Sequence, residues 1–177
     1  MAGSYRLDVF AAHFPEKFSR FAGAFARMLN GEANGSSFIA PVNEISFMAW
    51  AGGDIGILNP FALGRGPELK RQLVRATIEA IESIWGVTKN VRIIAPEPVI
   101  HITADYKRTH ERELAENYRL SMFEAWDMIS GRRSSELGGR PAYLDILGVN
   151  FYDRNQWIHD GPVLHPGDER TVLFETS

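Results

Sequence analysis

The sequence predicts an incomplete, TIM-barrel-like α/β unit in which about three parallel strands alternate with helices. Two observations indicate this fold class. Three stretches with helical periodicity alternate with three short, nearly continuous apolar runs, and such runs are typical of parallel strands covered on both faces. Polar and aromatic residues follow each run, at the strand ends where α/β proteins build their sites. We assign residues 1–177 to a single partial (β/α)8 domain, since a whole barrel needs roughly 250 residues.

The three predicted helices each carry an apolar stripe that we interpret as core packing. The first begins after Pro15, ends at Asn30 and Gly31, and aligns Phe14, Phe18, Phe21, Ala22, Phe25 and Leu29. The second precedes Gly86 and aligns Leu69, Leu73, Ala76, Ala80, Ile81 and Ile84. The third ends at Gly131 and aligns Leu114, Tyr118, Met122, Ala125, Trp126 and Ile129.

The predicted strands are the apolar runs "SFIAPVN", "VRIIAPEPVIHI" and "LDILGVNFY". The order helix, strand, helix, strand, helix, strand is an α/β pattern with right-handed crossovers. The segments 46–66 and 97–112 are long for connections that follow a strand. They therefore indicate loops that build a functional site.

Composition excludes several classes of function. The apolar fraction of 45% and charged fraction of 23% fit a globular protein, and the net charge of -3 without a basic block argues against nucleic-acid binding. No apolar run approaches the roughly 20 residues of a membrane span. The absence of cysteine excludes disulfides and thiolate metal sites and fits a cytoplasmic location. The histidines lack metal-ligand spacing, and we expect no metal and no cofactor.

Polar groups at the strand ends suit a sugar. Amides and carboxylates pair with hydroxyl groups, and tryptophan offers a flat apolar face for the C–H groups of a pyranose. The candidates are Asn43 and Glu44 after the first run, Glu97 and His101 at or beyond the end of the second, and Asn150, Tyr152, Asn155, Gln156 and Trp157 at the third. Hydrolysis of a glycosidic bond needs two carboxyl groups, and Glu44 is the best acid/base candidate.

Each of these residues also has a structural interpretation. Glu44 could be a salt-bridged carboxylate at a strand end, and Glu97, between two prolines, could occupy a solvated loop. His101 is more often a satisfied core histidine than a ligand. Trp50 and Trp85 fit either packing or a site.

The segment "PVNEISF" resembles the Asn-Glu motif at the end of the fourth barrel strand in retaining glycosidases of the β-glucosidase superfamily. Similarity to a β-glucosidase-like branch of family 1 glycoside hydrolases extends from about Tyr5 to Asp168, and "GVNFY" followed by "NQW" supports it. The resemblance implies that Glu44 is the general acid/base and that Asn43 binds the hydroxyl next to the reacting carbon. It further implies that Tyr152 orients the nucleophile, and that the sugar site is lined by Asn155, Gln156 and Trp157.

The chain departs from this family in two ways. Ile45 stands where characterised β-glucosidases usually have proline. The three strands would be the fourth to sixth of eight, so the seventh, which carries the nucleophile in this family, should lie further downstream. Glu175 in "VLFETS" has a similar context, but Gly161, Pro162, Pro166 and Gly167 argue for a loop before it. Glu175 is therefore either the nucleophile or the start of the next helix.

Two classes of function remain open. The chain is either a retaining O-glycosidase acting on β-glycosides, incomplete and weakly active or inactive, or a non-catalytic barrel remnant with a carbohydrate-binding or structural role. In either case we expect a small carbohydrate ligand. We also expect a homo-oligomer, held by unpaired strand edges or exposed helix faces.

Overall fold

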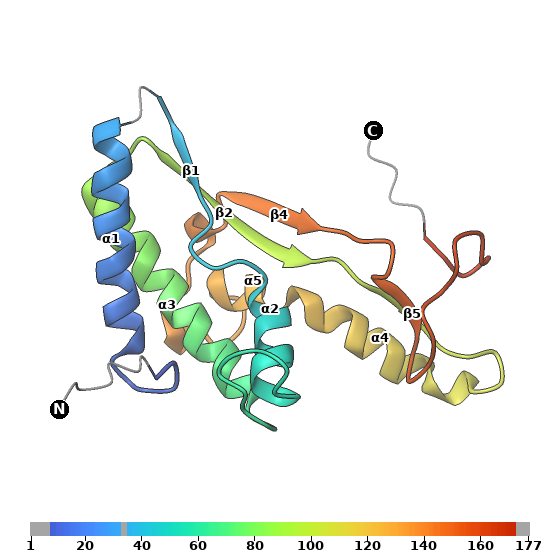
Figure 1. Cartoon of the computed structure of the whole chain (residues 1–177). Coiled ribbons are helices and arrows are strands. Elements are labelled where there is room, and N and C mark those ends of the chain that lie inside the picture. The colour runs from blue at the N-terminus through green and yellow to red at the C-terminus, as the bar shows by residue number, and fades with distance from the viewer. Residues whose placement is uncertain (1–7, 33–34, 173–177) are drawn as a thin grey trace.

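The computed structural model describes residues 8–32 and 35–172, so Glu175 lies outside the described residues. Figure 1 shows a layer of helices beneath a twisted sheet, with one arm extending beyond the strand ends. The helices are α1 (Phe14–Glu32), α2 (Ile45–Met48), α3 (Gly66–Val87), α4 (Arg112–Leu120) and α5 (Glu124–Ile129). The strands are β1 (Ser37–Ile39), β2 (Val91–Pro98), β3 (His101–Thr103), β4 (Ile146–Asn150) and β5 (Gln156–Ile158).

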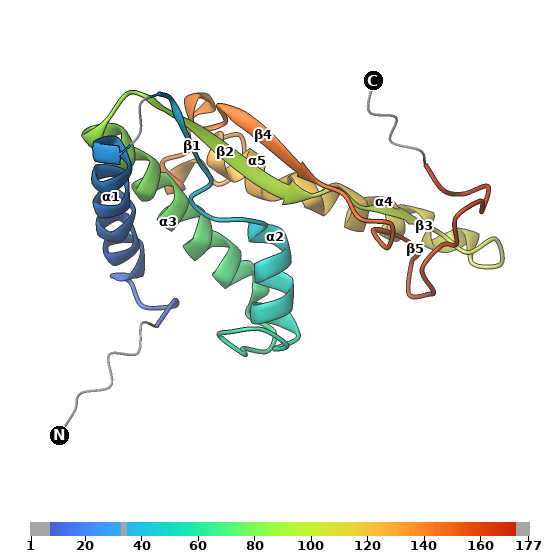
Figure 2. The ribbon, with the colours of Figure 1, turned by 45° about the horizontal axis from the view of Figure 1, so that its top comes forward.

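The main sheet has the order β1-β2-β4, and both pairs are parallel. Ile39 pairs with Ile93 on one side of β2, and Pro98 pairs with Asn150 on the other. All the helices lie on the same side of this sheet, as Figure 2 also shows. Alternating helices and parallel strands of this kind agree with the predicted fold class.

The core lies between α1, α3, α5 and the helix-facing side of the sheet. Ile39 and Ile93 point into it and join buried side chains of α3, notably Leu73, Ile81 and Ile84. The helices α1 and α3 pack side by side (Figure 1), and a Cβ atom on Gly23 of α1 would collide with the hydroxyl of Ser83 on α3. The absence of a side chain there permits the close approach.

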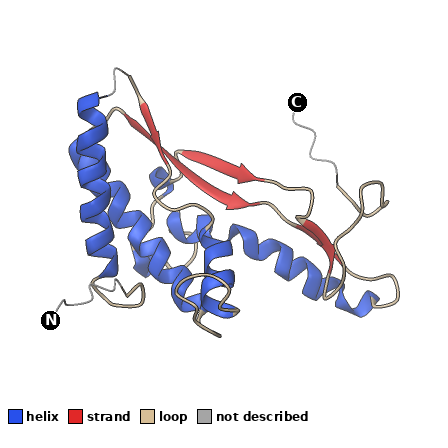
Figure 3. Ribbon diagram, in the orientation of Figure 1, coloured by secondary structure: helices blue, strands red, loops and turns tan. Residues whose placement is uncertain are grey.

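All three predicted strands are shorter than their apolar runs, and the third run forms strand only over Ile146–Asn150. The first run forms strand only over Ser37–Ile39, because the chain turns near Pro41, which has no N–H to donate to a ladder. The second run breaks after Pro98 into β2 and β3. β3 then pairs in parallel with β5, forming the separate ribbon of the extended arm in Figure 3.

The third predicted helix is also interrupted. A 3-10 turn, Ser121–Phe123, separates α4 from α5, and another, Thr109–Glu111, precedes α4. The stripe residues in and around α5, including Met122, Ala125 and Ile129, are buried, whereas Leu114 near the start of α4 is exposed. The core-packing interpretation therefore holds for α5 but is wrong for the first turn of α4, which extends beyond the main sheet.

Part of the first stripe is also exposed. Phe21 is 66% exposed and Phe25 is 39% exposed, and their rings stack on each other at the surface. The core-packing interpretation is wrong for these two residues, because α3 covers only one side of α1. On β4, Leu147 and Val149 pair with the helix-facing residues Ala95 and Glu97, but they remain exposed because the described helices leave that side of β4 uncovered.

Neither a membrane span nor a metal cluster is found in the described part of the chain. None of its helices is long and apolar enough to cross a bilayer. Within residues 8–32 and 35–172, no group of three or more His, Asp or Glu side chains could hold a metal ion.

Candidate active site

Asn43, Glu44 and Asn150 come together at the carboxyl ends of β1 and β4. The side-chain amide of Asn150 donates a hydrogen bond to Oε1 of Glu44 at 2.7 Å and another to Oδ1 of Asn43 at 3.1 Å. Asn150 ends β4 beside Pro98 of β2, so the sheet register brings residues more than 100 positions apart into one cluster. The cluster supplies a carboxylate and two amides, which are groups that hydrogen-bond hydroxyls.

The backbone of Glu44 is held in an uncommon conformation. Its φ of 53° and ψ of 59° lie in the left-handed region, and it immediately precedes α2. Its N–H donates to the carbonyl of Pro96 at 2.9 Å, and its carbonyl accepts from the N–H of Met48 at 2.8 Å. These bonds fix the point from which the Glu44 side chain leaves the chain.

Glu97 lies within β2 and is buried, with only 1% of the residue exposed. Its two carboxylate oxygens accept from the backbone N–H of Ser46 at 3.1 and 3.3 Å. The alternative of a solvated loop position is therefore wrong. Because Glu97 shares the helix-facing side of β2 with Ile93, its carboxylate points beneath α2 and not outward with the amide of Asn150.

Burial changes the acidity of Glu97. Removal from water raises the pKa of its carboxyl from 4.5 to about 7, while hydrogen bonds from Ser46 and Ile45 and the charge of Lys70 act in the opposite direction. A carboxyl group with this pKa changes its charge near neutral pH.

The predicted site residues that follow β4 differ in exposure and in hydrogen bonding. Tyr152 is 61% exposed and lies two residues beyond Asn150. Asn155 donates its amide to the carbonyl of Val99 at 3.0 Å, and the buried Gln156 accepts from the N–H of Val172 at 2.8 Å. These bonds attach β5 to neighbouring chain segments, a structural use that the sequence pattern does not reveal.

His101 also has a structural partner. Its Nε2 lies 2.9 Å from the carbonyl oxygen of Arg170, and the residue is partly buried. This agrees with the interpretation of His101 as a satisfied histidine in the structural framework. Trp85 packs against Tyr143, with ring centroids 5.8 Å apart.

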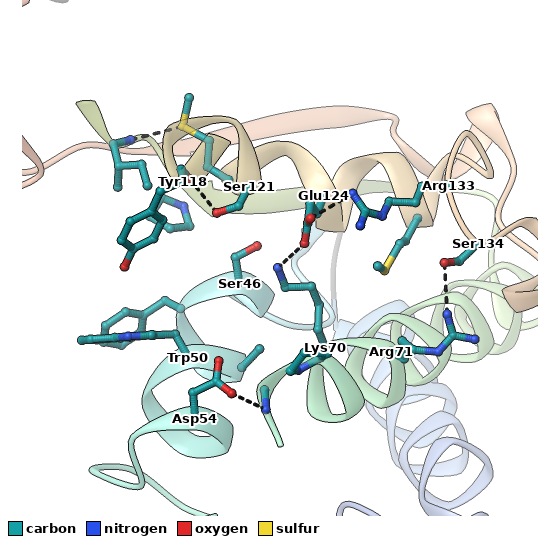
Figure 4. Close-up of a pocket in the computed structure, with 18 of the residues that line it drawn as sticks. Ser46, Trp50, Asp54, Lys70, Arg71, Tyr118, Ser121, Glu124, Arg133 and Ser134 are labelled. Atoms are coloured by element: carbon teal, nitrogen blue, oxygen red, sulfur yellow. Dashed lines mark hydrogen bonds and ion pairs between the residues drawn. The ribbon is translucent and has the colours of Figure 1, made fainter. Parts of the chain in front are cut away.

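A groove of about 750 Å³ lies on the helix side of the molecule, between α2 and α4. Asn155 and Trp157 line it, but Glu44 does not. Figure 4 shows Trp50 and Tyr118 facing each other across this groove. Trp157 contacts Tyr118 edge to face, with centroids 6.0 Å apart. Trp157 thus belongs to the lining of a groove to which Glu44 contributes no atom.

Charged side chains also line the groove. Lys70 of α3 contacts Glu124 at 2.8 Å, and Arg133 contacts the same carboxylate at 2.9 Å, as Figure 4 shows. Asp54 accepts from the N–H of Gly66 at 2.7 Å and caps α3. The hydroxyl of Ser46 is buried at the wall and makes no hydrogen bond within the described structure.

Sequence reasoning gave no role to several of these residues. Asn150 was recognised as a polar residue at a strand end, but only the pairing of β2 with β4 places it against Glu44. The helical stripe predicts a core position for Tyr118, but its side chain is exposed to the groove. The pairing of Lys70 with Glu124 joins two helices and has no local sequence signal.

Comparison with known structures places this fold among β-glucosidase barrels. The AHE enzyme from Alicyclobacillus herbarius matches with a TM-score of 0.67 at 16% identity, over 84% of this chain and 38% of that chain. A hyperthermophilic β-glucosidase from Pyrococcus furiosus gives 0.65 at 17% identity, over 88% and 31%. A rice β-glucosidase gives 0.63 at 14% identity, over 85% and 38%. No family model and no curated protein sequence matches the chain.

These similarities concern the fold, because every identity is far below 25%. The chain spans about a third of the length of these structures. Its three parallel strands and their helices form an incomplete α/β barrel unit, which confirms the predicted fold class.

Proposed function

We propose that this chain carries the acid/base part of a retaining O-glycosidase site for β-glycosides. Glu44 acts as the general acid/base and Asn43 binds the hydroxyl next to the reacting carbon, while Tyr152 orients the nucleophile. The observation that carries this proposal is the joint contact of Asn150 with Glu44 and Asn43, at strand ends of a fold similar to part of a β-glucosidase barrel. A carboxylate that an amide holds at the carboxyl ends of parallel strands is suited to proton transfer to a glycosidic oxygen.

The proposal includes low activity. A retaining mechanism needs a nucleophile about 5 to 5.5 Å from the acid/base carboxyl, and Glu175, the candidate nucleophile, lies outside the described residues. Residues that act as a unit in catalysis fail together when one is displaced. We therefore expect at most trace hydrolysis of nitrophenyl β-glycosides by the 177-residue chain.

The first experiment compares this chain with its Glu44→Gln variant on substrates with poor and good leaving groups. Loss of the acid should reduce hydrolysis of the poor leaving group by roughly 100-fold or more and affect the good one much less. Glu113→Gln, on the surface of α4, serves as the control. Equal rates for wild type and Glu44→Gln on both substrates would contradict the proposed role.

A fluorinated glycoside provides a second test, because 2-deoxy-2-fluoro glycosides trap the covalent intermediate of a retaining enzyme on its nucleophile. Peptide mass spectrometry then identifies the labelled residue. Labelling of Glu175 would assign the nucleophile, and it should disappear in Glu175→Gln. Robust turnover without any labelled carboxylate would contradict a retaining mechanism.

A second candidate function is carbohydrate binding without hydrolysis. The groove beside α2 favours it, because aromatic side chains including Trp50 and Trp157 line a space of about 750 Å³. This volume is within the usual range for small-molecule sites. Titration of tryptophan fluorescence with cellobiose tests it, since Trp50→Ala should abolish saturable quenching whereas Trp85→Phe should preserve it. Quenching by sugar without product would favour the non-catalytic remnant.

We extend this proposal to the binding partners and the cellular location of the chain. Its partners would be a small carbohydrate and further copies of the chain, associated through the unpaired edges of β1 and β4 or through exposed helix faces. A cytoplasmic location belongs to this proposal as well.

A further inference from the structure

The carboxylate of Glu97 and the candidate acid/base Glu44 are connected through the first turn of α2. Glu44 is the N-cap residue of α2, but its side chain makes no capping hydrogen bond. The N–H of Ser46 in the first turn instead donates to both carboxylate oxygens of Glu97, at 3.1 and 3.3 Å. A buried strand residue therefore supplies the cap that the helix lacks.

Pro96, the residue before Glu97 in β2, contacts the backbone of Glu44 itself. The carbonyl of Pro96 accepts the Glu44 N–H at 2.9 Å, so consecutive residues of one strand contact the chain just before and just after the Glu44 side chain. A left-handed conformation is unfavourable for a residue with a Cβ atom and persists only where its surroundings enforce it. These two contacts supply that enforcement.

We propose that Glu97 is a positioning residue, whose buried carboxylate holds the first turn of α2 and thereby fixes the direction in which the Glu44 side chain leaves the backbone. Its consequence for catalysis rests on the proposed glycosidase function. The mechanical connection between Glu97, Ser46 and Glu44 is independent of any turnover.

The elements around Glu97 determine how the contact responds to pH. Ser46 on α2 donates to the carboxylate, and α3 contributes the charge of Lys70, which is itself paired with Glu124 of the α5 helix at 2.8 Å. Tyr143 borders the same small cavity, and β4 contributes the uncharged Val149. The pKa of about 7 means that Glu97 loses its charge as the solution becomes mildly acidic. An uncharged carboxyl accepts the Ser46 N–H more weakly.

Amide NMR on the ¹⁵N-labelled chain tests this connection without a substrate. In the wild type, the backbone amides of Ser46 and Glu44 and the side-chain amide of Asn150 should shift together with a midpoint near pH 7. Glu97→Gln should abolish that common midpoint. Asp145→Asn is the matched control, because Asp145 also accepts a backbone N–H, that of Ile93 at 3.0 Å, but at the opposite end of the strands.

Each outcome decides a separate question. If the Glu44 and Asn150 signals do not follow Ser46 through the titration, the positioning role is wrong, and this result needs only the wild type. If they do but Glu44→Gln hydrolyses poor and good leaving groups as fast as the wild type, the positioning role stands and the glycosidase proposal fails. Where hydrolysis is measurable, Glu97→Gln should lower kcat about tenfold or more and change KM less than about threefold, because a small displacement of a catalytic group costs rate. An unchanged kcat would overturn the role in catalysis.

Discussion

Among single residues, Asn150 is the one that joins two distant segments at the candidate site. Its amide has two donors, and each is used on a different acceptor, Asn43 and Glu44. A hydrogen bond to a charged acceptor is stronger than one to a neutral acceptor. Asn150 thereby restrains the Glu44 carboxylate as well as joining β4 to the turn after β1.

Asn150→Ala should remove both bonds and leave the Glu44 carboxylate without this partner. We expect the free energy of unfolding to fall by about 1 to 2 kcal/mol, since the acceptors are partly exposed and water replaces part of the loss. Urea denaturation measures the change. Asn117→Ala, at an exposed position of α4, is the control and should change stability by less than about 0.5 kcal/mol.

Glu97 should make stability depend on pH in a defined direction. Because burial raises its pKa in the folded chain from 4.5 to about 7, the folded state binds this proton more tightly than the unfolded state. Stability should therefore fall as pH rises from 4.5 to 7 and show no further effect of this group above that range. The full effect corresponds to roughly 3 kcal/mol.

Glu97→Gln keeps the shape of the side chain and one oxygen that can accept a hydrogen bond, but the new side chain cannot ionise. The difference in free energy of unfolding between wild type and Glu97→Gln should change by about 2.5 kcal/mol between pH 5 and pH 8, because part of the effect is already lost by pH 5. The variant gains relative stability at the higher pH. Urea denaturation at both values checks it. A difference that is independent of pH would contradict the raised pKa of Glu97.

At the scale of elements, the chain after α5 turns back tightly against the end of that helix. Gly139 lies so close that an added Cβ would meet the Met128 carbonyl oxygen and lie 2.8 Å from that of Ile129. The N–H of the next residue, Arg140, donates to the Ile129 carbonyl at 2.9 Å. The turn thus satisfies a carbonyl at the helix end and requires a residue without a side chain.

Gly139→Ala should lower the free energy of unfolding by about 2 to 3 kcal/mol, because the neighbouring atoms belong to the backbone and cannot rotate away. Gly86→Ala is a contrasting variant near the end of α3, where nothing lies within 4 Å of an added Cβ. It should be neutral or stabilise the chain by up to about 1 kcal/mol. Thermal unfolding followed by circular dichroism compares the two. Equal stability of both variants would show that the close contact at Gly139 is not maintained in solution.

At the scale of the whole molecule, an open barrel unit leaves surfaces that a closed barrel buries. The main sheet ends in β1 on one side and β4 on the other, and each has a free edge within the described structure. Val149 is 58% exposed and Leu147 is 52% exposed at the β4 edge, while Phe38 is 62% exposed on β1. Exposed edges with apolar side chains are templates for pairing with another chain.

Association should therefore increase with concentration, and Val149→Lys should weaken it by placing a charge at the β4 edge. Leu114→Lys, at an exposed position of α4 away from the main sheet, distinguishes association through strand edges from association through a helix face. Sedimentation velocity over a wide range of concentrations measures both. A wild-type chain that stays monomeric throughout would show that these edges do not drive self-association.

The class of fold, and Asn43 and Glu44 as the centre of the candidate site, can both be predicted from local sequence pattern. Helical stripes and unbroken apolar runs depend on local periodicity, which a single sequence displays. The alternation of these elements leaves few arrangements other than a parallel sheet with helices. The sequence predicts strand boundaries less well. The strands end near Pro41 and at Pro98, although the apolar runs continue past these residues.

The surroundings of Asn43 and Glu44 depend on strand pairing, which local pattern does not encode. The pairing of β2 with β4 brings Asn150 to Glu44, and the alternation of sides along β2 turns Glu97 beneath α2. The pairing of β3 with β5 places Trp157 in the lining of a groove that Glu44 does not line. Which side of a strand a residue faces, and which residue lies opposite, depend on long-range register. A one-residue shift in register would turn Glu97 to the opposite side of β2 and move Asn150 out of its position beside Pro98, with no change in the sequence itself.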